Sequence, residues 1–516
     1  MSQNHKSLYT YLHHVFNHDN FQEGQKEIIT DILNGYDVLG ILRTGSGKSL
    51  CYQLPAIMLP GTTVVVSPLI SLMIDQVRQV KSYYYKEVVA IHSFQNMHER
   101  REILSRLHFY KLIYVSPELL QQQEFLQKLK EIKVSLFVID EAHCISQWGY
   151  DFRPDYLRLT NVINILGNPP ILALTGTATP EVQKDIMENL ELQYMKRHIY
   201  PMDRENISLL LHHVNGSEED KLTILSSLVS TYQQPTIVYF SSRNLTEKIA
   251  SVLSQRVPDR KIAYYHGGME NNDRLKIQQQ FMNEQLDVIC CTSAFGMGIN
   301  KKNIRLVIHY HLPTQIESYI QEIGRAGRDG KESISILLYK EGDIHVPLQI
   351  IENELPNEKE VSFVMNQLYI LHQKGKSKIP TSDEQLEQIF QLPITKWRFL
   401  HYQFESHGMI KENMIIYDKK YWQEIFQKIN RFCTMRKNLK YERLDDLINW
   451  VNTKECLRKK LYQNFQQQIP IKETQCCSNC GFSYEKWEKE IRPIKREKLE
   501  QQSWQHQLAD LLLIGD

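Results

Sequence analysis

Long apolar runs are missing from this sequence. None of its 516 residues lies in an uninterrupted hydrophobic stretch approaching the roughly 18 residues that a membrane-spanning helix needs. Residues 1–6 also lack the charged start, apolar run and small-residue cleavage site of an export signal. We therefore expect a cytoplasmic protein without membrane contact, in which thiols stay reduced.

The chain also lacks a net charge of either sign. Its 61 Lys and Arg residues stand against 60 Asp and Glu residues, which leaves a formal charge of +1. This balance excludes no class of partner, because a protein can hold nucleic-acid phosphates in a local groove while the rest of its surface is neutral overall. At roughly 150 residues per domain, the length predicts three or four domains.

Cysteines are few, and most of the nine are scattered along the chain. The exceptions are Cys476, Cys477 and Cys480, which lie close together near the C-terminal end. In a reducing compartment such a cluster favours a metal site over a disulfide.

Short β-branched and apolar runs alternate with amphipathic stretches from about residue 8 to residue 345. This rhythm is typical of parallel strands joined by crossover helices, and the strand ends are where α/β sheets place ligand-binding loops. The runs form two series, so we predict two tandem α/β lobes. The first series is 63–66, 112–115, 136–139 and 171–174, and the second is 236–240, 261–265, 287–290 and 306–309.

Beyond residue 350 the strand rhythm stops. Apolar residues at three- and four-residue spacing between Val361 and Leu371 predict a helix. A stretch after Ser382, another opening at Pro393 and the residues 407–417 then resemble a helix-turn-helix followed by a short β-wing. An ordinary helical connector is the alternative.

The clearest local signal is a glycine-rich string between the apolar run 38–42 and a helical stretch that begins at residue 50. It is typical of a phosphate loop that binds ATP. Its glycines let backbone N–H groups approach phosphates, Lys48 balances their charge, and the Ser49 hydroxyl ligates Mg²⁺. The strict pattern has a glycine where Leu42 stands. The string is Thr44-Gly45-Ser46-Gly47-Lys48-Ser49.

An acidic pair strengthens the prediction of a phosphate loop. Asp140 and Glu141 directly follow the apolar run 136–139. Asp140 is suited to hold the metal, and Glu141 to activate the attacking water. A lone acidic pair at a strand end usually caps a helix, but after a phosphate loop it indicates an ATPase.

The residues that follow the acidic pair resemble the RecQ family of superfamily 2 helicases. The resemblance implies two RecA-like lobes, ATP-dependent DNA unwinding with 3′ to 5′ polarity in recombination and repair, and an aromatic loop that contacts single-stranded DNA. Trp148 and Phe152 offer faces for base stacking, and Arg153 can contact phosphate. We count His143 and Gln147 with these DNA contacts. The string is Asp140-Glu141-Ala142-His143-Cys144-Ile145-Ser146-Gln147-Trp148-Gly149-Tyr150-Asp151-Phe152-Arg153-Pro154.

Other strings of the first lobe match the family with departures. Gln25 resembles the glutamine that reads the adenine edge, although Gln22 and His18 replace the arginine and tyrosine usual in the family. The loop beginning at Ser67 is similar to one that grips the DNA backbone. In the string 175–179, Gly176 stands where alanine is more usual.

Two arginines carry the resemblance into the second lobe. Arg325 and Arg328 lie in the string 321–329, and their spacing of three predicts one shared helical face. A guanidinium that reaches across a cleft can stabilise charge on the γ-phosphate, and we prefer Arg328 slightly for this role. Because the phosphate loop and the arginines belong to different lobes, we expect ATP to close the cleft between them.

The resemblance also bears on the cysteines. RecQ-like proteins usually carry zinc on one helical cysteine followed by a C-x2-C-x2-C run. Cys456, Cys477 and Cys480 match this pattern, whereas Ser483 replaces the last ligand, for which Cys476 is the substitute. Adjacent ligands on one ion are strained, so a set of metal-free thiols is the alternative. Bound zinc would stabilise the fold of this region.

The order of parts departs from the family, in which the winged helix follows the zinc module and an accessory helical domain usually ends the chain. We expect no such accessory domain here. The predicted parts are RecA-like lobe 1 at 1–198, RecA-like lobe 2 at 199–345, a winged-helix-like region at 346–430, a zinc-binding helical module at 431–485 and a charged tail at 486–516.

The expected partners are single-stranded DNA and tailed or forked duplexes, with a single-strand-binding protein as a further candidate. We expect a monomer associated with the nucleoid. An RNA helicase and a DNA-binding scaffold without turnover are the rival hypotheses. The aromatic loop disfavours the first, and the intact Lys48, Glu141 and Arg328 disfavour the second.

Overall fold

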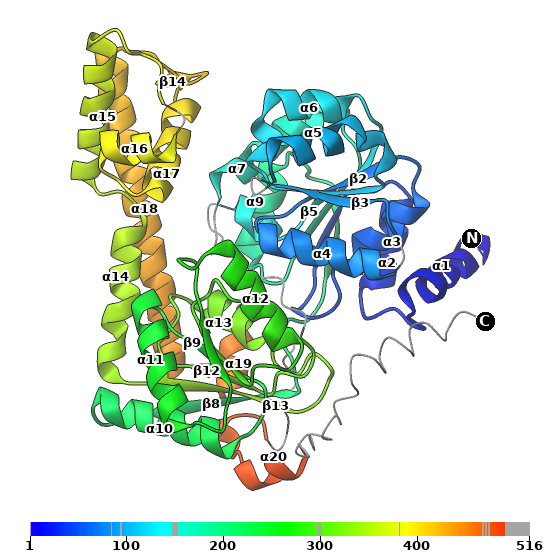
Figure 1. Cartoon of the computed structure of the whole chain (residues 1–516), viewed down its shortest axis with the longest axis vertical. Helices are drawn as coiled ribbons and strands as arrows, with labels where there is room; N and C mark the ends of the chain where they lie inside the picture. The colour runs from blue at the N-terminus through cyan, green and yellow to red at the C-terminus, as the bar shows by residue number, and fades with distance from the viewer. Residues whose placement is uncertain are drawn as a thin grey trace.

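The structure is a computed structural model that describes residues 2–83, 85–92, 95–146, 153–296, 301–380, 382–466, 469, 472 and 475–490. Figure 1 shows two α/β lobes, one above the other, and a helical head beside the upper lobe that is joined to the lower lobe by helices. The predicted class of two parallel-sheet lobes followed by a helical region is confirmed. Among the described residues, every helix is too short or too polar to traverse a bilayer.

Lobe 1 is built on a seven-stranded parallel sheet with the strand order β3-β4-β2-β5-β6-β1-β7. Helices on both faces bury the inner strands, which explains why these strands are continuously apolar. The strands are β1 (Val38–Ile41), β2 (Thr62–Val66), β3 (Val88–Ile91), β4 (Leu112–Val115), β5 (Val134–Ile139), β6 (Ile171–Thr175) and β7 (Lys196–Ile199). The helices are α1 (Ser2–Phe16), α2 (Gln25–Leu33), α3 (Leu50–Met58), α4 (Ile70–Ser82), α5 (Met97–Ser105), α6 (Gln123–Lys130), α7 (Pro154–Leu157), α8 (Leu159–Ile165) and α9 (Pro180–Asn189).

Lobe 2 repeats this design with a six-stranded parallel sheet in the order β10-β11-β9-β12-β13-β8. Its strands are β8 (Ile207–His213), β9 (Thr236–Tyr239), β10 (Ile262–Tyr265), β11 (Val288–Cys291), β12 (Leu306–His309) and β13 (Ser333–Tyr339). Its helices are α10 (Glu218–Thr231), α11 (Arg243–Arg256), α12 (Asn271–Met282) and α13 (Ile316–Ile323).

The head has its own hydrophobic core, formed by residues between Leu355 and Cys433. Its helices and short antiparallel hairpin follow the order predicted for the winged-helix-like region. In its core the rings of Phe390 and Trp397 stack with centroids 3.9 Å apart. The elements from residue 345 on are α14 (His345–Glu354), α15 (Glu358–Gln373), α16 (Asp383–Phe390), α17 (Ile394–Ser406), β14 (Ile410–Lys411), β15 (Met414–Ile415), α18 (Lys419–Val451), α19 (Leu457–Tyr462) and α20 (Tyr484–Glu490).

Helix α18 joins the head to lobe 2, so the predicted boundary at residue 430 falls inside a single helix. Its last turns pack Leu444, Leu447 and Trp450 into the core that also contains strands of both lobes. The Trp450 indole donates a hydrogen bond to the Leu457 carbonyl at 2.9 Å, which fixes α19 against the end of α18. The region with the cysteines is therefore packed against the two lobes.

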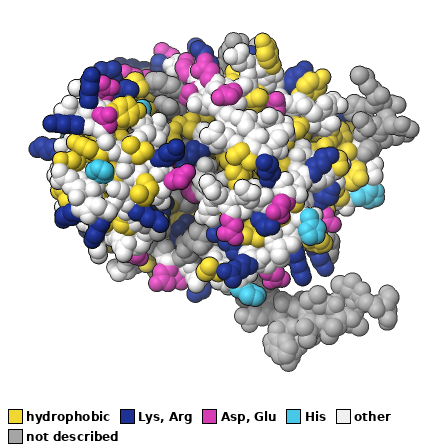
Figure 2. All heavy atoms as spheres, turned by 90° about the horizontal axis from the view of Figure 1, so that it is seen from above, with side chains coloured by type: hydrophobic (Ala, Val, Ile, Leu, Met, Phe, Trp, Pro, Cys, Tyr) yellow, Lys and Arg dark blue, Asp and Glu magenta, His cyan; other side chains and the backbone are white. Residues whose placement is uncertain are grey.

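Charge is mixed over the surface seen from above. Figure 2 shows Lys and Arg side chains interleaved with Asp and Glu side chains on this face. On this face the formal charge of +1 therefore reflects mixed charges, not a surface of a single sign.

Candidate active site

The loop 44–49 joins β1 to α3 and contains two glycines in the left-handed backbone region. Gly45 has φ +88° and Gly47 has φ +68°, which residues with a Cβ adopt only with strain. Leu42 is buried, and its N–H donates to the Thr175 carbonyl at 3.1 Å. Leu42 thus continues the pairing of β1 with β6, so this loop does not need the glycine of the strict pattern there.

Gln25 packs directly under this loop. Its side-chain amide donates to the Ser46 carbonyl at 2.9 Å and to the Gly47 carbonyl at 3.1 Å. Its amide oxygen accepts from the Gln22 N–H at 2.8 Å. The sequence predicts that Gln25 binds the adenine edge. In the structure the same side chain also holds the backbone of the phosphate loop through these hydrogen bonds.

Gly176 makes room for the Lys48 ammonium. A Cβ placed at Gly176 would lie 3.0 Å from Lys48 Nζ and 3.2 Å from Thr44 Oγ1. Lys48 and Thr44 therefore lie against the loop that follows β6. This contact gives a physical reason for the glycine at a position where alanine is more usual.

The acidic pair lies at the end of β5, and β5 is next to β6 in the sheet. Asp140 is 8% exposed, and its Oδ1 accepts from the Glu141 N–H at 3.0 Å. Glu141 has φ 52° and ψ 50°, a left-handed conformation that is uncommon for a residue with a side chain. Glu141 Oε2 is buried and accepts no hydrogen bond from the described residues.

His143 links the acidic pair to the neighbouring loop. Its Nδ1 lies 2.9 Å from Thr175 Oγ1 and 3.4 Å from Glu141 Oε2. Because His143 is only 1% exposed, it faces the protein interior in this structure rather than a surface where DNA could lie.

Burial gives Asp140 an unusual proton affinity. Loss of hydration, followed by the charge of Glu141, raises the pKa of Asp140 to about 7, although Lys48 opposes this. A buried carboxylate that is costly to ionise alone is stabilised by a cation. Lys48 is near enough to act on Asp140, and Ser49 is the next residue in the chain. These residues fit the predicted Mg²⁺ site.

The two arginines do not share a helical face. Helix α13 ends at Ile323, and Gly327 has φ +54°, so Arg325 and Arg328 lie in the turn that follows. We call residues 324–328 the arginine turn. Arg325 is 3% exposed and donates to the Gly296 carbonyl inside lobe 2. The prediction of one shared face was wrong because the glycines break the helix.

Arg328 reaches the phosphate loop. A Cβ placed at Gly45 would lie 3.0 Å from Arg328 Cγ, and one placed at Gly324 would lie 3.0 Å from Thr44 Cβ. The lysine and acids of lobe 1 and the arginine turn of lobe 2 therefore border the same space between the lobes. Burial, then the charges of Arg325 and Arg204, lowers the pKa of Arg328 to about 9, as expected where like charges crowd.

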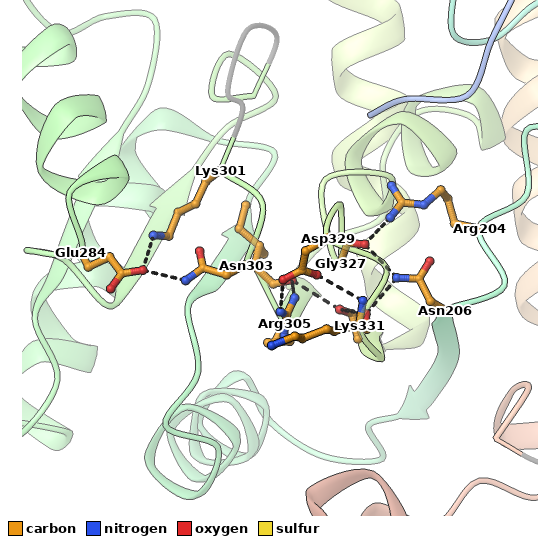
Figure 3. Close-up of polar contacts among 11 residues, drawn as sticks. Arg204, Asn206, Glu284, Lys301, Asn303, Arg305, Gly327, Asp329 and Lys331 are labelled. Atoms are coloured by element: carbon orange, nitrogen blue, oxygen red, sulfur yellow. Dashed lines mark hydrogen bonds and ion pairs between the residues drawn. The ribbon is translucent and has the colours of Figure 1, made fainter. Parts of the chain in front are cut away.

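A third guanidinium, not predicted from the sequence, comes from the segment 200–206 that links the lobes. Arg204 donates to the carbonyls of Thr44 and Gly324, each at 3.2 Å, and to the carbonyl of Gly327. Figure 3 shows Arg204 and Asn206 converging on Gly327. Arg204 stands in the charged string Asp203-Arg204-Glu205-Asn206, which reads as a solvated linker, so no sequence signal singled it out.

Comparisons with known proteins agree with this geometry. The DEAD/DEAH box helicase family model matches residues 22–186, and the helicase conserved C-terminal domain model matches residues 220–330. The Mycobacterium smegmatis helicase Lhr, solved with single-stranded DNA and AMP-PNP, shares the fold with a TM-score of 0.56 at 18% identity, over 81% of this chain and 59% of that one.

Relatives in sequence decide the family. The probable ATP-dependent DNA helicase RecS of Bacillus subtilis is 40% identical over 510 residues, which cover 98% of both chains. This chain belongs to the RecQ/RecS family of ATP-dependent DNA helicases. The RecQ protein of Haemophilus influenzae is also 40% identical, over 366 residues that cover 70% of this chain and 58% of that protein.

Two of the DNA contacts predicted for this RecQ-family chain lie side by side. Arg153 Nη1 donates to the Pro68 carbonyl at 2.9 Å, which joins it to the loop that begins at Ser67. The Ser67 side chain itself is 1% exposed. Gln147, Trp148 and Phe152 lie outside the described residues, so their predicted contacts stay predictions.

The four cysteines predicted as metal ligands converge. The sulfur atoms of Cys456, Cys476, Cys477 and Cys480 all lie within 4.8 Å of one another, and those of Cys456 and Cys476 are 3.7 Å apart. Four thiolates at about 2.3 Å from one tetrahedral zinc ion would be about 3.8 Å apart. Without a metal, hydrogen bonding within the cluster lowers the pKa of the Cys477 thiol, while hydrogen bonding and burial raise the pKa of Cys476 and Cys480, so a bound metal would have to displace protons from the cluster.

Ser483 stands where the family has its last cysteine ligand, and in this structure it is bonded to Gln475. Gln475 binds the backbone of Ser483 in both directions, each hydrogen bond being 2.8 Å long. The cysteine segment is also joined to β8, because the Leu209 N–H donates to the Cys476 carbonyl at 3.2 Å. This cluster could hold a metal ion, and its position at the edge of the lobe 2 sheet indicates a structural role.

Proposed function

We propose that this RecQ-family protein is a DNA helicase that moves 3′ to 5′ along single-stranded DNA and couples ATP hydrolysis to duplex unwinding in recombination and repair. The observation that carries the proposal is the approach of Arg328 and Gly324 from lobe 2 to Gly45 and Thr44 of lobe 1. A nucleotide held by that loop would touch both lobes, so its hydrolysis would change their separation.

The residues divide the chemistry between them. Backbone N–H groups of residues 44–49 and the Lys48 ammonium would bind the phosphates, with Gln25 at the adenine. Ser49 and Asp140 would hold Mg²⁺, which neutralises charge on the β- and γ-phosphate oxygens when bound. Glu141 would orient the attacking water, since its buried Oε2 accepts no hydrogen bond from the part of the chain that the structure describes.

Lobe 2 completes the site. The Arg328 guanidinium would stabilise the charge that develops on the transferred phosphoryl group, while Arg325, held by the Gly296 carbonyl, would keep the turn in place. Removing Arg328 should therefore lower kcat far more than it weakens nucleotide binding.

DNA binding is proposed for the surface of lobe 1 around Arg153 and the loop that begins at Ser67, together with the aromatic residues Trp148 and Phe152. Stacking of a base on an aromatic side chain contributes about 1–3 kcal/mol and is available to any base. We propose single-stranded DNA and tailed or forked duplexes as substrates, a single-strand-binding protein as a partner, and a monomer acting at the nucleoid. Zinc on the four cysteines is part of the same proposal.

Strand displacement on duplexes with a 3′ or a 5′ tail, made of DNA or of RNA, tests the function. We expect unwinding of the 3′-tailed DNA with ATP and Mg²⁺, and ATPase activity stimulated by single-stranded DNA. Stronger stimulation by RNA would instead support an RNA helicase. Nucleotide binding without DNA-stimulated turnover would support a scaffold, and unwinding only from a 5′ tail would overturn the polarity.

A further inference from the structure

Arg204 occupies a position that the helicase motifs leave unexplained. It lies in the segment between the lobes, it is 8% exposed, and its guanidinium donates to one carbonyl of lobe 1 and two of lobe 2. The lobe 1 acceptor, Thr44, opens the phosphate loop. The lobe 2 acceptors, Gly324 and Gly327, directly precede Arg325 and Arg328. One planar group thus connects the phosphate loop with both ends of the arginine turn.

The three groups that Arg204 bonds do not neutralise the positive charge of its guanidinium. Its three acceptors are neutral carbonyl oxygens, and its Nη1 would lie 3.2 Å from a Cβ placed at Gly45. Burial, then the nearby charge of Arg43, lowers the pKa of Arg204 to about 10. A guanidinium kept charged in such surroundings needs an anion or several strong acceptors, and a fork of two nitrogens serves carbonyls on both lobes at once.

The linker that carries Arg204 is anchored from the other side. Arg458 of α19 forms a buried ion pair with Asp203 and donates to the Arg204 carbonyl at 3.2 Å. The Gln466 side chain accepts from the N–H groups of Met202 at 2.9 Å and of Asp203 at 3.3 Å. The backbone of Arg204 is therefore fixed by the region that also contains the cysteine cluster.

We propose that Arg204 is a positioning residue of the ATPase site, which sets the arginine turn against the phosphate loop. The inference rests on the proposed function and deepens it. It assigns the linker, and through Asp203 and Arg458 the cysteine module, a direct part in arranging Arg328 for hydrolysis.

The geometry separates this role from nucleotide binding. Gln25, Lys48 and the N–H groups of the loop belong to lobe 1, and Arg204 bonds only the first carbonyl of that loop, so nucleotide affinity should change little without it. Turnover should suffer, because displacement of a catalytic group by about 1 Å can cost on the order of 100-fold in rate.

Asn206 provides a matched control. Its side-chain amide donates to the Gly327 and Lys331 carbonyls, each at 2.8 Å, and both acceptors belong to lobe 2. Figure 3 shows Asn206 and Arg204 approaching the same turn. Asn206→Ala thus loosens the arginine turn within lobe 2 without removing a hydrogen bond to lobe 1.

The experiment compares Arg204→Ala, Arg204→Lys and Asn206→Ala in the full chain. DNA-stimulated kcat is measured by phosphate release, nucleotide Kd with a fluorescent ATP analogue, and Tm by fluorescence. For Arg204→Ala we expect kcat to fall at least about 10-fold and Kd to change less than about 3-fold. Arg204→Lys should recover little, because one ammonium cannot occupy the positions of both Nη1, which bonds Thr44 and Gly324, and Nη2, which bonds Gly327. Asn206→Ala should lower kcat clearly less than Arg204→Ala does, because it removes no hydrogen bond to lobe 1.

The outcomes separate the possibilities. Unchanged kcat in Arg204→Ala, or an equal loss in Asn206→Ala, would overturn the positioning role, and so would full recovery by lysine. If Arg204→Ala fails to fold, Arg204→Lys, which keeps the charge, carries the test through its kcat and Kd alone. Absence of DNA-stimulated ATPase in the parent protein would instead refute the proposed function.

Discussion

Replacing Arg458 by methionine tests how firmly the cysteine module is fastened to the linker. The side chains of Arg458 and Asp203 are each 1% exposed, and Arg458 also donates to the carbonyls of Arg204 and Ile207. Methionine keeps much of the volume but none of the donors, so it leaves a buried carboxylate and two carbonyls without this partner. Breaking a buried ion pair in this way costs about 3–5 kcal/mol.

Urea denaturation followed by tryptophan fluorescence measures the loss, and a double-mutant cycle with Asp203→Asn isolates the pair. We expect each single variant to lose stability and the double variant to lose clearly less than their sum. Arg398 and Asp383 form a matched exposed pair, with side chains 62% and 54% accessible, whose removal should cost less than about 1 kcal/mol. Metal content is measured in parallel, because Arg458 also contacts Cys476.

The variant should acquire a characteristic pH dependence. Burial already raises the pKa of Asp203, and Arg458 opposes that rise, so removing Arg458 lifts the pKa further. A carboxyl whose folded pKa exceeds its unfolded value stabilises the fold at low pH, and this stability is lost as pH rises through the folded pKa. Arg458→Met should therefore be less destabilised near pH 5 than near pH 8. A cost equal to that of the exposed pair, or one independent of pH, would refute the reasoning.

Three further predictions concern the ATP site, the cysteines and a buried histidine. Lys48→Ala should lower kcat at least about 100-fold, while DNA binding, measured by fluorescence anisotropy, stays unchanged. Gly176→Ala displaces the Lys48 ammonium only slightly, so its kcat should stay within about 3-fold of the parent value. Stringent chelation, or the substitution Cys480→Ser, should remove about one zinc ion per chain and lower Tm. The control Cys433→Ser should change neither. A parent protein with less than one metal ion per chain and a Tm that chelation leaves unchanged would contradict this prediction. Burial, then the charge of Lys221, lowers the pKa of His311 from 6.5 to about 3, so the unfolded chain takes up the proton first and stability falls as pH drops below 6.5. Between pH 6.5 and about pH 5 the loss should approach about 2 kcal/mol, and His311→Gln should flatten this slope in denaturation curves.

Most strands of both sheets were predicted because parallel strands covered on both faces are continuously apolar, but the buried strands β3, β8 and β13 were not among the predicted runs. The same rule explains the omission of β7, whose residues Lys196–Ile199 are largely exposed at the sheet edge and carry no apolar run. Its place in the sheet depends on pairing with β1, a contact that local sequence does not encode.

The phosphate loop and the acidic pair were predictable because their chemistry requires particular residues at fixed spacing. Arg204 was not, since its importance arises from three carbonyls that are 120 residues or more away in sequence. The arginine turn shows the opposite error. A spacing of three suggested a helical face, but the glycines at 324 and 327 end the helix and direct Arg325 and Arg328 to different lobes.

Two of the polar contacts between the lobes are individually weak. Near the phosphate loop, Arg204 contributes one hydrogen bond to lobe 1, and elsewhere Gln278 of α12 donates to Asp75 of α4. Hydrogen bonds that involve a charged group contribute about 1.5–3 kcal/mol each. A nucleotide bound with micromolar affinity supplies about 8 kcal/mol, which exceeds the sum of the two. We predict that ATP binding replaces both contacts to the extent that ATP binds the closed arrangement more tightly, and that hydrolysis restores them.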